Sequence, residues 1–378
     1  MPLLCRIVGV IWWLFVAAAQ VFAAEVTISL PILAPVTGFM SLEGTSQRNG
    51  ALLAVREAPS GLTVNAEVTD TGTQPEVAVN AYERVISEGS PLAVMAPMYG
   101  PQTLALLPLV LDSKIPLISQ AGTAKITQTG NPYVFRFFPD DRVAKTAHVR
   151  YVLEELGKRR IAVLYQNTAY GQSGHEQIDT LLKGYGLTPV FEESVDVRVR
   201  DFTPILDKAL AADPDALIVH LHSEPTALFL HQAAGKVQVP IVAGSAVHQP
   251  STVALLAPWE LKGVCGETNA SPISGGSPQM DRFTAEYRKM FNSEPDGFAL
   301  AEYDAVTAVL TAVEAGARTP AALTQALSTD TFHGLAMTYK SDGTGNMAHS
   351  SMIICYDGNS RVPKIVKRYD NLAGLSGK

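Results

Sequence analysis

The residue patterns that mark common enzyme active sites are incomplete in this sequence. Gly171-Gln172-Ser173-Gly174 places a serine between glycines, but it lacks the Gly-x-Ser-x-Gly spacing of a nucleophile elbow. His175-Glu176 could open a zinc-binding helix pattern, but Asp179 stands where the second histidine is required. No phosphate-binding loop ends in Gly-Lys-Ser/Thr, and no pattern pairs a nucleophile with a base. We therefore expect no catalytic residues, and a binding protein rather than an enzyme.

Three histidines follow predicted strands, namely His220, His222 and His248. They could form a metal-ligand cluster, but histidines with ordinary hydrogen bonds in a cleft or at the surface are the favoured interpretation. We expect no metal and no cofactor. Only His222 is retained as a candidate ligand-binding residue.

Two loops carry groups that suit a carboxylate. Gly100-Pro101 predicts a helix start, because proline is favoured in the first helical turn, and such a start leaves backbone N–H groups free. Free N–H groups at a helix start attract an anion. The loop Ala121-Gly122-Thr123 adds further backbone groups and a hydroxyl. A plain helix cap is the alternative interpretation of Gly100.

These loops belong to an alternation of strands and helices. In the first half the predicted strands are 28–33, 62–68, 92–96 and 115–119. From residue 143 to residue 243 the same alternation repeats. This order predicts an α/β fold with two doubly wound parallel-sheet lobes. Ligands of such sheets bind beyond the carboxyl ends of the strands. Near the C-terminus we expect a hairpin over 338–347, turning at Asp342-Gly343, and a last strand over 351–356.

The first loop supplies more candidates for a binding cleft. An irregular segment over 39–44 follows the first strand, and Thr45 or Ser46 is expected to cap the helix behind it. Binding clefts require an apolar wall. The candidates for that wall are Phe39, Leu42 and Tyr99.

The order of short motifs resembles the solute-binding proteins of branched-chain amino-acid ABC transporters, which are type I periplasmic binding proteins. The match begins at Pro35-Val36-Thr37-Gly38 and continues through Gly44, Gly50-Ala51 and Ala54-Val55. Later markers are the segments 116–123, 170–174 and 302–306. The resemblance extends over essentially all of the chain after residue 23.

This resemblance implies a three-segment hinge between the lobes, with crossings near 140–143, 267–270 and 349–351. Lobe 1 would then comprise residues 24–142 plus 269–349, and lobe 2 residues 143–268 plus 350–378. It also implies a small-molecule solute bound between the lobes and an inner-membrane ABC permease as partner. We expect a monomer.

The resemblance also assigns site residues. Thr123 matches a family threonine, whereas Gly100 stands in place of a serine; the matching positions hold the α-carboxylate and ammonium of an amino acid. Tyr170 matches an aromatic residue that faces the ligand from the second lobe. Ser245 stands where amino-acid binders carry an acid. Glu43 or Glu302 could replace that acid; otherwise the solute is an aromatic or aliphatic acid, or an amide, without an α-amine. A ligand-sensing role for the same fold stays open.

Composition and the N-terminus indicate an exported protein. The chain has 378 residues, of which 47% are hydrophobic and 17% charged, which suits about two folded domains. Arg6 precedes an apolar run, and Val21-Phe22-Ala23 resembles a cleavage site, so residues 1–23 are a predicted signal peptide and the protein is expected in the periplasm. The remainder carries 28 basic and 36 acidic residues, which argues against nucleic acid as a partner. Cys265 and Cys355 could form a disulfide or remain separate thiols.

Overall fold

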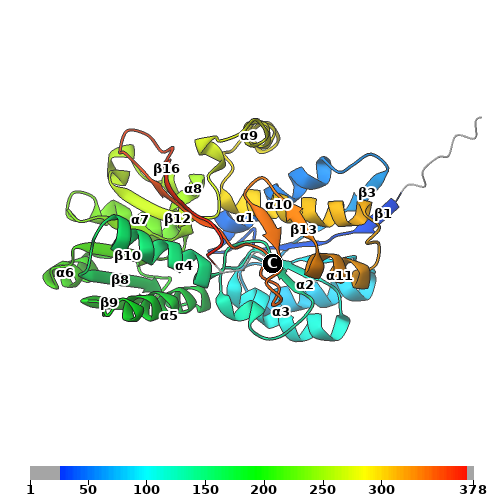
Figure 1. Cartoon of the computed structure of the whole chain (residues 1–378), viewed down its shortest axis with the longest axis horizontal. Coiled ribbons are helices and arrows are strands. Elements are labelled where there is room, and N and C mark those ends of the chain that lie inside the picture. Colours follow the sequence, from blue (N-terminus) through cyan, green and yellow to red (C-terminus); the bar gives the residue numbers. More distant parts are fainter. Residues whose placement is uncertain (1–25, 373–378) are drawn as a thin grey trace, which may run out of the picture.

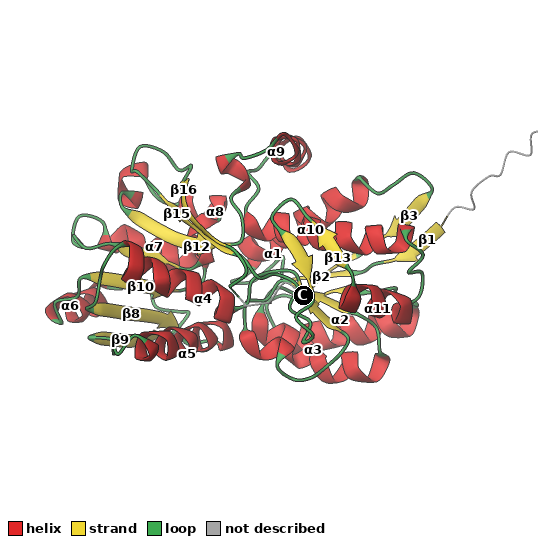
Figure 2. Ribbon diagram, viewed as in Figure 1, coloured by secondary structure: helices red, strands yellow, loops and turns green. Residues whose placement is uncertain are grey.

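Short runs of buried apolar residues form the strands of two sheets, which lie side by side in the molecule (Figure 1). The structure, a computed structural model, describes residues 26–372. The predicted signal peptide lies outside these residues. In both lobes helices flank the strands (Figure 2). The predicted fold of two doubly wound α/β lobes is confirmed.

The first sheet has five parallel strands in the order β4-β2-β5-β6-β7. Its strands are β2 (Ile32–Ala34), β4 (Val68–Asp70), β5 (Val94–Met95), β6 (Leu117–Ser119) and β7 (Val134–Arg136). Strand β1 (Val26–Ser29) pairs separately with β3 (Leu62–Asn65). The single strand predicted over 28–33 is therefore wrong, and the break falls at Pro31, which has no N–H to donate to a ladder.

Five helices accompany this sheet: α1 (Ser41–Arg56), α2 (Pro75–Glu88), α3 (Gly100–Ser113), α10 (Gly297–Glu314) and α11 (Pro320–Thr329). Helix α1 begins at Ser41 and has no side-chain cap, so the predicted cap at Thr45 or Ser46 is wrong. The Ser46 hydroxyl instead donates to Asp296 Oδ2 over 2.8 Å. Helices α1 and α10 touch so closely that a Cβ at Gly50 would lie 2.0 Å from the Ala299 carbonyl oxygen.

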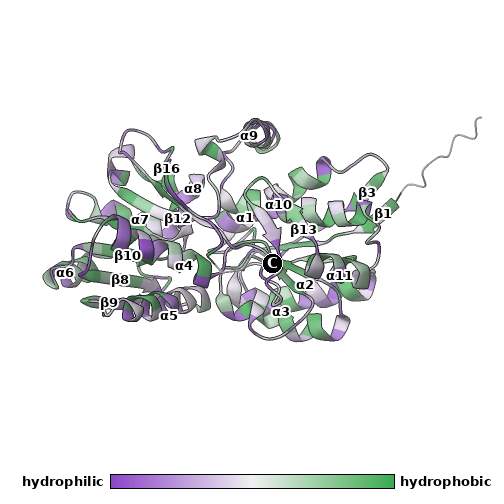
Figure 3. Cartoon of the chain, in the orientation of Figure 1, coloured by the Kyte–Doolittle hydropathy of each residue, from purple (hydrophilic) through white to green (hydrophobic). Residues whose placement is uncertain are grey.

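The second sheet has seven strands in the order β16-β15-β12-β11-β10-β8-β9. Its strands are β8 (Ile161–Gln166), β9 (Phe191–Val195), β10 (Ala216–His220), β11 (Ile241–Ala243), β12 (Val264–Thr268), β15 (Ser351–Cys355) and β16 (Lys364–Tyr369). The first five are parallel, whereas β15 and β16 run antiparallel. Figure 3 shows β8 and β10 as mostly hydrophobic, as expected for strands covered on both faces.

The helices of the second lobe are α4 (Asp141–Arg150), α5 (Ala169–Gly184), α6 (Thr203–Ala211), α7 (Ser223–Ala233) and α8 (Pro250–Val253). Helix α4 continues into a π-helical turn, Tyr151–Glu155. Helix α9 (Pro278–Phe291) packs against α1 with Phe283 and Tyr287 buried. None of the helices in the described part of the chain is long and apolar enough to span a membrane.

The chain passes between the two sheets three times. The first passage joins β7 to α4, the second follows β12, and the third joins β14 (Thr338–Lys340) to β15. Strand β14 pairs with β13 (Thr331–His333), so the predicted hairpin over 338–347 does not form as a pair of regular strands. The chain does turn back at Asp342-Gly343, where the N–H groups of Lys340 and Asp342 donate to the carbonyl oxygens of Met347 and Asn346, each over 3.0 Å. The Asp342 carboxylate accepts from the backbone N–H of Thr344, which makes a local turn within the loop.

Cys265 and Cys355 face one another in the antiparallel pair β12 and β15 and form a disulfide. The bond ties the last crossing strand to the parallel part of the second sheet. Of the two alternatives that the sequence leaves open, the structure therefore has the disulfide.

Candidate ligand-binding site

The loops at the carboxyl ends of the strands in both sheets converge on one buried cavity. The strand order reverses between β2 and β5 in one lobe and between β8 and β10 in the other, which are the positions where open α/β sheets bind ligands. The cavity is lined by Met40, Glu43, Met98, Tyr99, Gly100, Gln120, Gly122, Thr123, Phe138, Tyr170, His222, Ser245, Ala246 and Phe298. The cavity is large enough to hold water molecules.

Gly100 and Thr123 form one corner of this cavity. A Cβ at Gly100 would lie 2.2 Å from Thr123 Oγ1, so only glycine lets the start of α3 approach that hydroxyl. Pro101 has no N–H, and the N–H groups of Gln102 and Thr103 both bond to the Tyr99 carbonyl oxygen. Gly100 is thus the residue in this first turn whose N–H has no acceptor among the described residues. The sequence predicts several free N–H groups at this helix start, whereas among the described residues the structure has one, that of Gly100.

Three lining side chains leave buried polar atoms without partners. These atoms are Thr123 Oγ1, Glu43 Oε2 and both amide atoms of Gln120, as judged within residues 26–372. Buried polar groups in folded proteins nearly always have a partner, and an unpaired one costs about 1–3 kcal/mol. Unpaired atoms that gather around one cavity indicate a site for a polar ligand.

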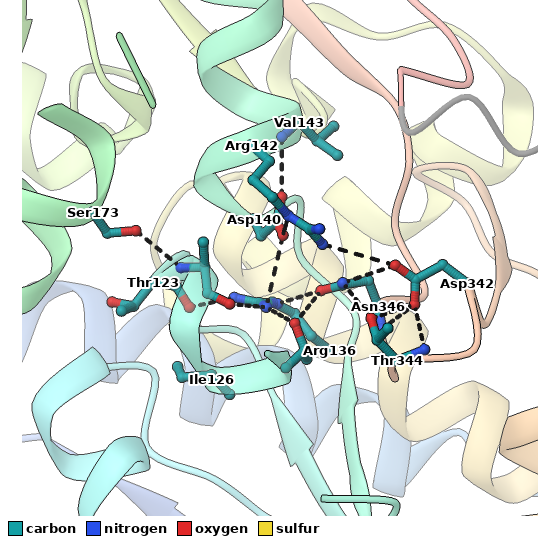
Figure 4. A network of polar contacts seen from close by, with 12 residues as sticks. Thr123, Ile126, Arg136, Asp140, Arg142, Val143, Ser173, Asp342, Thr344 and Asn346 are labelled. Carbon is teal, nitrogen blue, oxygen red and sulfur yellow. Dashed lines mark hydrogen bonds and ion pairs between the residues drawn. The ribbon is translucent and has the colours of Figure 1, made fainter. Parts of the chain in front are cut away.

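Arg136 holds the Thr123 loop from behind (Figure 4). Its guanidinium Nη1 donates to the carbonyl oxygens of Ala121 over 3.0 Å and Thr123 over 2.7 Å. Its Nη2 donates to the Ala124 carbonyl oxygen over 3.3 Å and to the Thr127 hydroxyl. Because the carbonyl groups face this buried cation, the Thr123 hydroxyl remains available to the cavity.

The same network joins two of the three interlobe passages. Arg136 Nε donates to Asn346 Oδ1 over 2.9 Å, and Asn346 Nδ2 donates to Asp342 Oδ2 over 3.0 Å. Arg142 then bridges Asp342 and Asp140, the latter over 2.7 Å (Figure 4). The segment that positions the Thr123 loop is therefore also part of the hinge.

Glu43 and Glu302 lie differently with respect to the cavity. Glu43 lines it, with Oε1 accepting from the Ser223 N–H over 3.1 Å and from the Ser223 hydroxyl, and burial raises its pKa. Glu302 does not line it, and its Oε1 accepts from Gln47 Nε2 over 3.5 Å. Burial raises the pKa of Glu302 to about 8, so this side chain is neutral at pH 7.

Aromatic rings from both lobes close the cavity. Phe39, Tyr99 and His222 contact one another edge to face, with ring centroids 5.1–5.9 Å apart. Tyr170 packs against His222 at 5.1 Å and against His220 at 4.0 Å. Burial lowers the pKa of His222 to about 3, so it is a neutral ring at physiological pH.

Eight of the twelve candidate residues predicted from the sequence line the cavity: Glu43, Tyr99, Gly100, Gly122, Thr123, Tyr170, His222 and Ser245. Phe39 contacts two of them but does not line it, and Ala121 lies behind, bonded to Arg136. Leu42 faces a separate surface groove with Pro250 and Tyr287. The sequence predicts that Leu42 lines the cleft because residues 39–44 are expected to form an irregular segment. In the structure Leu42 lies in the first turn of α1.

The sequence reasoning missed six lining residues: Met40, Met98, Gln120, Phe138, Ala246 and Phe298. Met98 and Gln120 adjoin loops that were identified, so extending each loop by a residue or two would have found them. Phe138 lies in the first passage between the lobes. Phe298 lies in the first turn of α10, and no local signal connects it with the other loops.

The histidines considered as metal ligands have other partners. His220 Nε2 lies 3.2 Å from the Tyr170 carbonyl oxygen, and His248 Nε2 lies 2.8 Å from the Ser271 hydroxyl. Over residues 26–372 no three His, Cys, Asp or Glu side chains gather in a way that could hold a metal ion.

Two α/β lobes with a three-segment hinge and a cavity at their facing strand ends define a clamshell binding protein. The chain belongs to the periplasmic binding protein family, whose family model matches residues 27–356. It is a leucine-binding-protein-like type I member of the kind that serves ABC transporters.

Individual relatives are distant in sequence. The chain is 23% identical to the leucine-, isoleucine-, valine-, threonine- and alanine-binding protein of Pseudomonas aeruginosa over 337 residues, 83% of this chain and 85% of the relative. A branched-chain amino acid transporter substrate binding protein from Streptococcus pneumoniae, solved with isoleucine, matches with a TM-score of 0.81 at 22% identity, covering 90% and 99%. A solute binding protein of an ABC transporter from Rhodopseudomonas palustris, solved with 3,4-dihydroxybenzoic acid, matches with a TM-score of 0.83 at 19% identity, covering 91% and 98%. The two structures show the shared fold.

Proposed function

We propose that this chain is the periplasmic solute-binding component of an ABC importer, and that it delivers a small carboxylate solute to an inner-membrane permease. The observation that carries the proposal is the set of unpaired buried polar atoms at a cavity built by loops of both lobes. The protein performs no bond chemistry. The solute shifts the protein toward the closed form, and the free energy of this shift is the difference in solute affinity between the closed and open forms.

The carboxylate is assigned to the corner formed by Gly100 and Thr123. An N–H group and a hydroxyl can bond its two oxygens, and the positive end of the α3 dipole favours its charge. The rings of Tyr99, Tyr170 and Phe298 supply apolar wall for the rest of the solute. Amino acids and aromatic acids both fit this description, and the relatives named above include binders of each kind.

Closure of two lobes on the solute is part of the proposal. We place the lobe boundaries at residues 24–142 plus 269–349 and at residues 143–268 plus 350–378, in keeping with the three passages between the sheets. Contacts between the lobes beside the cavity support a closed arrangement. The Ala124 N–H donates to Ser173 Oγ over 3.0 Å, and Gln249 Nε2 donates to Ser46 Oγ over 3.3 Å.

The sequence and the family support a proposed location and set of partners. Cleavage after residue 23 would release a chain of formal charge −8 into the periplasm, as a monomer without a nucleic-acid partner. N-terminal sequencing of protein recovered from a bacterial periplasm tests the export step. A start at Ala24 or Glu25 is expected, and a start at Met1 would refute it.

A thermal-shift screen tests the binding function. The panel contains the common amino acids, benzoate, 4-hydroxybenzoate and 3,4-dihydroxybenzoate, each beside its carboxamide. A solute at 100 times its dissociation constant stabilises the folded protein by about 2.7 kcal/mol, which is readily seen as a higher melting temperature. Small-angle scattering of each hit should show a smaller radius of gyration. A panel without any hit, or hits without compaction, would count against the proposal.

A further inference from the structure

Helix α7 of the second lobe begins without a cap from its own segment. Its N-cap residue is His222, whose side chain makes no capping hydrogen bond. The carboxylate of Glu43, on helix α1 of the other lobe, takes that place. Its Oε1 accepts from the Ser223 N–H over 3.1 Å and from the Ser223 hydroxyl. A carboxylate at this helix start also interacts favourably with the positive end of the helix dipole.

The second oxygen of this carboxylate is not used. Glu43 is 2% exposed and lines the cavity, and its Oε2 has no hydrogen-bond partner within the described part of the chain. One oxygen thus bonds the opposite lobe, and the other is left for the contents of the cavity. A buried acceptor of this kind stays unsatisfied until a donor arrives.

No protein cation is available to supply that donor. Glu43 is the one acidic residue among those that line the cavity, and no described Lys or Arg lies among them. The charge that acts on the pKa of Glu43 is that of Asp296, which is also acidic and raises it. The neighbouring rings of Tyr99, Tyr170 and Phe298 would favour a positive group over a negative one.

We propose, building on the binding function above, that Glu43 couples solute recognition to lobe closure. The solute brings a hydrogen-bond donor, an amine or a hydroxyl, to Oε2, while Oε1 caps helix α7 of the opposite lobe. Closure without this donor buries a carboxylate that is only half satisfied, and the donor removes that penalty. Selectivity for a donor therefore comes from α1 in this chain, and the loop after β11, with Ser245, contributes no acid.

Isothermal titration with two matched pairs of acids tests this coupling. L-isoleucine is compared with 3-methylpentanoate, and 4-hydroxybenzoate with benzoate, so each pair differs only in the donor. The donor stands next to the carboxylate in the first pair and across the ring in the second. In the wild type the donor-bearing member of at least one pair should bind at least about tenfold more tightly, as expected for a hydrogen bond to a charged group.

Two variants test the roles of the two Glu43 carboxylate oxygens separately. Glu43→Gln keeps the shape but removes the charge and should reduce the preference within that pair to less than about threefold. Ser223→Ala removes the hydroxyl that meets Glu43 Oε1 and also lies 2.6 Å from Gln249 Oε1, without changing a residue that lines the cavity. It should weaken both members of the pair by the same factor, because neither Ser223 nor Gln249 lines the cavity. Melting temperatures of the solute-free variants verify that both are folded.

Several results would overturn the inference. If acids without a donor bind the wild type as tightly as their partners, Glu43 is not the acceptor, although the proposed binding function stands. The same holds if the preference survives in Glu43→Gln, or if Ser223→Ala leaves both affinities unchanged. If no member of either pair binds, the inference fails together with the assignment of a carboxylate solute.

Discussion

Arg136 Nη1 lies 2.7 Å from the carbonyl oxygen of Thr123, and the arginine side chain is fully buried. The arginine therefore fixes the backbone of the loop that presents the Thr123 hydroxyl to the cavity. Through Asn346 it is also bonded to the third passage between the lobes. The Thr123 loop and the third passage between the lobes are thus bonded to the same buried cation. A change in the position of one should therefore alter the position of the other.

Replacing this cation tests its role. Arg136→Lys keeps the charge but cannot reach the carbonyl oxygens of Ala121, Thr123 and Ala124 together, since a lysine lacks the planar fork. We expect a loss of about 3 kcal/mol in the free energy of unfolding, measured with urea, because buried acceptors lose their donor. Arg198→Lys, at a site where the side chain is 88% exposed, is the control and should change stability by less than about 0.5 kcal/mol. Equal effects of the two changes would contradict the positioning role.

Thr123→Val should weaken solute binding and leave the fold intact. Valine keeps the shape of the threonine side chain but removes the hydroxyl whose oxygen has no other described partner. Hydrogen bonds to charged groups contribute about 1.5–3 kcal/mol, so the dissociation constant for a carboxylate should rise roughly 10- to 100-fold. Thr180→Val, on the exposed face of α5, is the matched control in the same titration. An unchanged affinity in Thr123→Val would remove this hydroxyl from the site.

Glu302 should make the protein less stable as the pH rises. Its pKa is raised by burial to about 8, above the ordinary value of 4.5. Between these values the folded protein keeps a proton that the unfolded chain has lost, so the free energy of unfolding falls by about 1.4 kcal/mol per pH unit. The contribution is complete below pH 4.5 and is lost by about pH 8.

Unfolding of the Glu302→Gln variant in urea at pH 5, 6, 7 and 8 measures this contribution. Other buried acids, such as Asp141 with a pKa of about 7, keep their own pH dependence, so the difference between variant and wild type isolates Glu302. The variant should gain stability relative to the wild type as the pH rises. Glu314→Gln, exposed on the same helix, should run parallel to the wild type. A parallel curve for Glu302→Gln would place the pKa of Glu302 near its ordinary value.

The disulfide should contribute substantially to the stability of the second lobe. It closes a loop between residues 90 positions apart, for which chain entropy predicts an upper value of about 4–5 kcal/mol. Urea unfolding of the double variant Cys265→Ser and Cys355→Ser should therefore show a lower midpoint. Dithiothreitol should lower the midpoint of the wild type in the same way and leave the variant unaffected. A wild type insensitive to the reductant would show that the two thiols are free.

The sequence predicts the layered fold well because strand–helix alternation and apolar runs are local signals. It places Gly100 and Thr123 together correctly because both follow parallel strands, β5 and β6, that end at the same edge. It fails for Leu42, because α1 begins at Ser41 without a capping side chain that the sequence could reveal. Because Leu42 lies inside the helix and not in an irregular loop, its side chain points to the face of α1 that meets Pro250 and Tyr287.

Contacts that join distant segments carry no local signal. Glu43 and Ser223 are 180 positions apart, and neither segment contains a sequence pattern that predicts a carboxylate of one lobe capping a helix of the other. Phe298 reaches the cavity because the chain returns to the first lobe in its third section. The buried Arg136 is likewise indistinguishable in sequence from a solvent-exposed arginine at the end of a strand.

The most direct test of the central claim is titration of the wild-type protein with acids and with their carboxamides. The panel contains the common amino acids and the plain and hydroxylated benzoates. We expect at least one acid to bind and its amide to bind at least about tenfold more weakly, because the amide loses charge-assisted hydrogen bonds at Gly100 and Thr123. Binding of an amide as tightly as its acid, or binding of no acid at all, would contradict a carboxylate site in the interlobe cavity.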